Sequence, residues 1–158
     1  MTDAEWAAGR PGDARGLSRL GRAYAFFRRW REQGLITEFH DRMRGKVRER
    51  EGREAEPAAG IIDAQSVRAA ATLPAASRGC DGGKKVPGRK RHIVTDTLGL
   101  LLVIAVTAAN TGDRDAAAGL LKRLCRLHHD ITLVWAGGGC TGSLADWCRD
   151  RLALPWRS

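Results

Sequence analysis

Gly60–Val106 is the most informative part of the chain, with the segments GIIDAQSV (60–67), DGGKKVPGRKRH (81–92) and IVTDTLGLLLVIAV (93–106). The first segment predicts a short strand that carries a carboxylate, Asp63, inside an apolar run. A basic, glycine-rich loop follows, and then come two strands joined by turn residues at 96–99. An acidic side chain on a strand beside a positive loop indicates metal-dependent chemistry on a polyanion.

The net charge of +9 over 158 residues is concentrated in two blocks. Residues 22–50 and 78–92 each carry a net charge of +5, and the remainder of the chain sums to −1. Two basic blocks on a near-neutral background favour a nucleic-acid partner, with plain solvated surface charge as the alternative. The acidic start and the absence of a long apolar run predict a cytoplasmic protein with no membrane segment.

The pattern of apolar residues divides the chain into four parts. Residues 1–21 have no clear period and are expected to be poorly ordered. Residues 22–50 predict two basic helices that meet at Gly34, either a small DNA-binding hairpin or a plain helical hairpin with an aromatic core. Residues 51–59 read as a linker, and residues 60–158 form the second domain.

The second domain predicts the order strand, strand, strand, helix, strand, helix, an α/β fold that begins with a three-strand meander. The run Leu100–Val106 is nearly continuous and apolar, as expected of a strand covered on both faces. Asp96 is expected to serve in a turn and Asp113 to cap the helix that follows it. The last strand is predicted at Ile131–Ala136.

Several motifs of the chain resemble bacterial insertion-sequence transposases of the DDE type. They are the segments IIDAQSVR (61–68) and 81–102, together with ANTGDRD (109–115) and LVWAGGGCTG (133–142). The resemblance implies an incomplete RNase H-like catalytic core, preceded by a helical DNA-binding region in which FFRRWREQGL (26–35) fits. It further implies DNA cleavage and strand transfer, with terminal repeats and target DNA as partners.

In that family three carboxylates hold two Mg²⁺ ions that act on a phosphodiester. By resemblance, the first carboxylate is Asp63. The family's usual WADGGY reads WAGGGC here, so Gly137 stands where the second aspartate is expected, and Cys140 replaces the aromatic residue. The third carboxylate has no counterpart. The metal site is therefore expected to be incomplete and the copy to be catalytically inactive, because one carboxylate cannot hold two Mg²⁺ ions.

The basic segments are retained, and their predicted role is contact with DNA phosphates. A mobile charged loop is the alternative for the segment at 81–92. The candidate DNA-binding residues are Lys84, Lys85, Arg89, Lys90, Arg91 and His92 in the loop and Arg28, Arg29 and Arg31 in the first helix.

Relative to the family pattern, the chain reads as an internally deleted and C-terminally truncated copy. The fifth strand and closing helix of an RNase H-like sheet would lie beyond Leu152, so an open sheet edge and self-association are expected. Three functions stay open: an inactive transposase copy, a DNA-binding remnant that interferes with intact transposase, and a decaying reading frame without function.

Overall fold

The structure is a computed structural model that describes residues 19–70, 72–137 and 143–157. Most of the predicted N-terminal remnant and the predicted family position Cys140 lie outside these residues. The chain divides into two compact units, and the boundary along the sequence falls between Ala55 and Glu56. This division falls inside the predicted linker.

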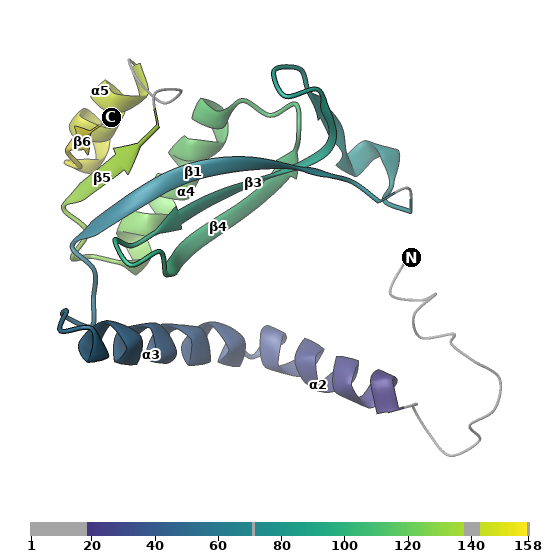
Figure 1. The fold of residues 1–158 in the computed structure, drawn as a ribbon, viewed down its shortest axis with the longest axis horizontal. Helices are drawn as coiled ribbons and strands as arrows, with labels where there is room; N and C mark the ends of the chain where they lie inside the picture. The colour runs from purple at the N-terminus through teal and green to yellow at the C-terminus, as the bar shows by residue number, and fades with distance from the viewer. Residues whose placement is uncertain (1–18, 71, 138–142, 158) are drawn as a thin grey trace. The chain divides into compact units, whose positions relative to one another are not determined.

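The first unit contains helices α2 (Arg19–Glu32) and α3 (Leu35–Arg50), which follow one another end to end (Figure 1). Gly34 lies between them in the left-handed conformation, with φ at 75°, as its sequence position predicts. Its amide donates to the Arg31 carbonyl (3.1 Å), and its own carbonyl accepts from Glu38 (3.0 Å). One glycine therefore ends the first helix and begins the second.

The apolar stripe of these helices is exposed. Large side chains recur at helical spacing, yet Phe39 is 66% exposed and Trp30 is 53% exposed. The aromatic core of the plain-hairpin alternative is not seen, because helices that run end to end have no shared face to bury. The exposed members of the stripe are Leu20, Phe26, Phe27, Trp30, Leu35, Phe39, Met43 and Val47.

The second unit is built on one mixed sheet. Strand β1 (Ala59–Arg68) pairs antiparallel with β3 (Val86–Thr95), and β3 pairs antiparallel with β4 (Leu101–Ala108). Helix α4 (Asp113–Leu127) then leads to β5 (Leu133–Ala136), which lies parallel to β1 on its other side. An antiparallel meander extended by a parallel strand is the arrangement of an incomplete RNase H-like sheet, so the predicted fold class is confirmed.

Two short strands were not predicted. Strand β2 (Gly79–Asp81) pairs with the start of β3, next to the 3₁₀ turn η1 (Ala75–Ser77). After helix α5 (Ser143–Leu152), strand β6 (Trp156–Arg157) pairs parallel with β5. The expectation that no strand follows Leu152 was wrong, because two residues continue the sheet at this edge.

The core of this unit lies between the sheet and α4. The helix turns one apolar face to the sheet, and Figure 1 shows it crossing behind β1, β3 and β4. Leu121 and Leu124 are fully buried there, as is Val94 on β3. The helical spacing of the leucines, which predicted this helix, is what places them on one face. Leu144, Cys148 and Leu154 extend the same core around α5.

The opposite face of the sheet is open within this unit. On β4, Val103 is buried against the core, whereas Ile104 and Val106 are exposed. The expectation that β4 is covered on both faces was therefore wrong. Side chains alternate between the two faces of a strand, so a continuous apolar run places apolar residues on both faces. It does not show whether another element covers each face.

Candidate functional site

Asp63 lies on the open face of the sheet. It occupies the middle of β1, is exposed, and stands directly opposite Ile93 of β3. The strand alternation explains this position, since Ile62 on one side of Asp63 is buried in the core. The structure thus places the first predicted catalytic residue where a substrate can reach it.

Gly137 comes directly after β5 in the chain. The parallel pairing of β1 with β5 ends at Ile62 and Ala136, so Asp63 and Gly137 are each the next residue beyond the last pair. Neighbouring strands lie about 4.8 Å apart, and paired residues of parallel strands turn to the same face. A Cβ atom built on Gly137 meets nothing within 4 Å. There is therefore space for a side chain at Gly137, but glycine itself supplies no side-chain oxygen ligand.

Asp96 and Asp113 hold parts of the fold together. Asp96 is fully buried, and its Oδ1 accepts the amides of Leu98 (2.9 Å) and Leu100 (2.8 Å), as the predicted turn requires. The predicted capping role of Asp113 was wrong, because the cap residue of α4 is Gly112. The Asp113 carboxylate instead lies 3.0 Å from the ammonium group of Lys90.

Asp63 belongs to no metal-binding cluster in the part of the chain that the structure describes. Within that part, no group of three His, Cys, Asp or Glu side chains is placed to hold a metal ion. Mg²⁺ prefers several carboxylate and water oxygens in octahedral geometry. The described residues therefore do not fit the two-metal site that the resemblance implies.

The basic segment after β2 divides into exposed and buried members. Lys84, Lys85 and Arg91 are exposed, and Arg89 is half-buried, with its Nε donating to the Ser77 carbonyl (3.1 Å). Arg91 also donates to the side-chain oxygen of Gln65 on the neighbouring strand. Lys90 is buried instead, because it shares the core side of β3 with Val94.

Lys90 and His92 are bound inside the protein. The Lys90 ammonium group donates to the Thr111 carbonyl (3.0 Å) and also lies 3.6 Å from the Asp81 carboxylate. His92 is 2% exposed and within 3.0 Å of the Thr107 hydroxyl. Burial lowers the pKa of His92, so its imidazole is neutral at pH 7. Neither side chain is at the surface to meet a phosphate.

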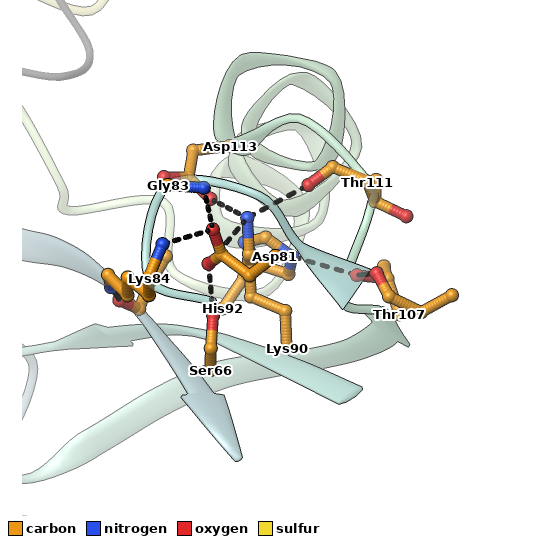
Figure 2. Close-up of polar contacts among 11 residues, drawn as sticks. Ser66, Asp81, Gly83, Lys84, Lys90, His92, Thr107, Thr111 and Asp113 are labelled. Atoms are coloured by element: carbon orange, nitrogen blue, oxygen red, sulfur yellow. Dashed lines mark hydrogen bonds and ion pairs between the residues drawn. The ribbon is translucent and has the colours of Figure 1, made fainter. Parts of the chain in front are cut away.

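Asp81 closes the turn that carries the exposed lysines (Figure 2). Its Oδ1 accepts the amides of Gly83 and Lys84, each at 3.1 Å, and its Oδ2 accepts from the Ser66 hydroxyl. The amides of Gly83 and Lys84 are therefore bound by Asp81 and are not free to bind a phosphate. An aspartate two residues before a glycine is a turn signal, and this signal in DGGKK was present in the sequence.

The packing of the strands explains why residue 88 is a glycine. A Cβ atom there would collide with the carbonyl of Val67 and lie 2.7 Å from the amide of Ala69, both in the chain of β1 or just beyond it. Gly88 therefore permits the close approach of two strands. This packing accounts for the glycine without a contact between its backbone and phosphate.

In the first unit, the three predicted arginines of α2 are all exposed. Arg28 pairs with Glu32 one turn later (3.8 Å), and the Arg29 guanidinium lies 5.4 Å from the centre of the Phe26 ring. Exposed pairs of this kind are weak, so the charges stay accessible to a polyanion.

The mixed sheet with an exposed aspartate on β1 has the layout of an RNase H-like domain. Residues 54–154 match the family model of the transposase DDE domain. The match spans more than half of the chain, and the protein belongs to this family of transposase domains. No match was found among the curated proteins or among the solved structures with which the chain was compared.

Two further findings bear on the setting of the domain. The family match begins at residue 54, within two residues of the point where the second compact unit starts. Among the described helices, none has the length and apolar character needed to cross a membrane.

Proposed function

We propose that this protein is a DDE transposase copy that binds DNA through its exposed basic residues and does not cleave it. The observation that carries the second half of the proposal is that Asp63 follows the last residue of β1 paired with β5, whereas Gly137, which follows the last paired residue of β5, has no carboxylate. Cleavage by two metal ions requires ligands that hold both ions about 3.5–4 Å apart. One carboxylate cannot fix two ions in that geometry.

Two groups of exposed side chains support DNA binding. Lys84, Lys85 and Arg91 lie on the second unit, close in the chain to the strand that carries Asp63, and three arginines lie on α2. The Lys84 ammonium group donates to the carbonyl of Ala64 at 3.3 Å, one residue beyond Asp63. A phosphate backbone bound at this turn would therefore run past the catalytic strand, as in an enzyme that acts on DNA.

One experiment tests both halves of the proposal. The purified protein is mixed with supercoiled plasmid and with a labelled duplex, at increasing KCl, with Mg²⁺ or Mn²⁺ present. If the six exposed side chains neutralise six phosphates, the slope of log K against log salt is about −5 on duplex DNA. Nicking of the plasmid should not exceed that of an Asp63→Ala control.

The two readouts contradict different parts of the proposal. A flat salt dependence would remove the DNA-binding half. Metal-dependent nicking that disappears in the Asp63→Ala variant would remove the non-cleaving half, because it would require ligands beyond those that the sheet brings together.

A further inference from the structure

We propose that Asp81 is a positioning residue for DNA binding, which holds the Gly82–Lys85 turn so that Lys84 and Lys85 meet phosphates of duplex DNA. This inference rests on the proposed DNA-binding function and names the residue that organises its surface. Asp81 is the one acidic residue in the basic segment 78–92, so its charge would repel DNA where the charges of its neighbours attract it.

The Asp81 carboxylate joins the turn to two strands of the sheet (Figure 2). One oxygen closes the turn through the amides of Gly83 and Lys84. The other is held by the Ser66 hydroxyl of β1 and lies 3.6 Å from the Lys90 ammonium group of β3. The turn is thereby tied to the strand that carries Asp63, three residues before Ser66.

Lys90 connects the same cluster to the start of α4. Its ammonium group is bound by Thr111 and Asp113 as well as by Asp81. Two carboxylates around one buried ammonium group neutralise its charge within the protein, so Lys90 anchors the turn instead of contacting DNA.

The Asp81 carboxylate is ionised wherever DNA binding can be measured. The Ser66 hydrogen bond, followed by that of the Lys84 amide, lowers the pKa of Asp81 to about 2, although burial acts in the opposite direction. Its hold on the turn is therefore constant across the neutral pH range.

The turn needs such a hold. It contains two adjacent glycines, and Lys85 has a φ of 55°, a left-handed conformation that residues other than glycine seldom adopt. Without Asp81 the turn would have many conformations, and ordering it would become part of the cost of binding DNA.

The inference predicts a result opposite in sign to simple electrostatics. Asp81→Asn removes a negative charge beside DNA, which by charge alone would strengthen binding. We expect instead about fivefold weaker binding, the change that corresponds to ordering roughly one residue's backbone during binding. The Lys84→Ala, Lys85→Ala double variant should reduce the salt slope by about 2.

The test is a double-mutant cycle on the full chain, measured by fluorescence anisotropy with a short labelled duplex of arbitrary sequence. In the background of the two lysine substitutions, Asp81→Asn should change binding little, because the residues that it positions are gone. The matched control is Asp96→Asn, since Asp96 also accepts two backbone amides in a turn, but that turn (97–99) has no basic residue. Asp96→Asn should leave the affinity for the duplex unchanged.

Circular dichroism confirms that each variant is folded at the assay temperature. If Asp81→Asn is not folded, Ser66→Ala carries the test, because it removes one hydrogen bond to Asp81 and should weaken binding in the same direction. Binding by a folded Asp81→Asn variant that equals or exceeds wild type overturns the inference. An equal loss with and without the two lysines overturns it as well, because Asp81 would then act on the fold in general. Absence of salt-dependent binding by the wild-type protein overturns the proposed function, and the inference with it.

Discussion

At the scale of single residues, the candidate site consists of Asp63 and Gly137. Each is the next residue beyond the last pair of β1 with β5, and space for a side chain at Gly137 is available. In the proposed function, what this position lacks is a carboxylate, and the space around Gly137 would accept one.

Gly137→Asp should create a site that responds to divalent cations. Two adjacent carboxylates repel each other, and a bound cation relieves that repulsion. We expect the thermal midpoint of Gly137→Asp to rise with Mg²⁺ or Mn²⁺, by about 1.4 kcal/mol in the free energy of unfolding when the ion is at tenfold excess over its Kd. The wild-type protein should show no comparable rise.

Differential scanning fluorimetry over a cation titration measures this effect. Gly137→Asn is the matched control, because it has nearly the same volume without the charge. A response by the asparagine variant equal to that of the aspartate variant would show that the cation binds elsewhere, and the expectation would be wrong.

Residue roles in the basic segment were only partly accessible from the sequence. Exposure of Lys84, Lys85 and Arg91 agrees with the predicted contact with DNA, which stays a prediction. Lys90 and His92 are buried because they alternate onto the face of β3 that α4 covers. The alternation can be predicted from one sequence, but the position of α4 cannot. The turn signal of Asp81 is present in the sequence, but the net charge of the segment includes it only as one negative charge among lysines and arginines.

At the scale of elements, the spacing of apolar residues predicted the helices and strands that pack in the core of the second unit. Leucines at helical spacing identified α4, and apolar runs identified β1, β3 and β4. Strands β2 and β6 have three and two residues, too few for a period to appear. The open face of β4 could not be predicted either, because Ile104 and Val106 look like core residues until the covering elements are known.

The α4 face should account for much of the stability of the second unit. Leu121→Ala removes a fully buried side chain and should lower the free energy of unfolding by about 2–5 kcal/mol. Leu127→Ala makes the same chemical change at the end of the same helix, where the side chain is 49% exposed, and should cost less than about 1 kcal/mol. Urea denaturation followed by circular dichroism compares the two. Equal losses would mean that α4 does not pack on the sheet through this face.

At the scale of the whole molecule, exposed apolar residues occur together with a large positive charge. The open sheet face of the second unit presents Ile61, Val67, Ile104 and Val106. The first unit has its own exposed apolar stripe on α2 and α3, so each unit exposes an apolar surface. Burial of such surfaces between copies favours association, whereas the net charge of +9 opposes it. The balance between the two depends on salt.

We therefore predict that self-association increases with salt, in contrast to DNA binding, which weakens. Raising the ionic strength from 0.1 to 1 M shortens the Debye length from about 10 to about 3 Å, so repulsion between copies is screened while apolar burial persists. Sedimentation velocity at the two salt concentrations should show a larger average mass at the higher one. Replacing Ile104 and Val106 by threonine, which keeps the β-branched shape, should reduce the association at high salt. A monomer at both concentrations, or dissociation as salt rises, would mean that the open face does not bring copies together.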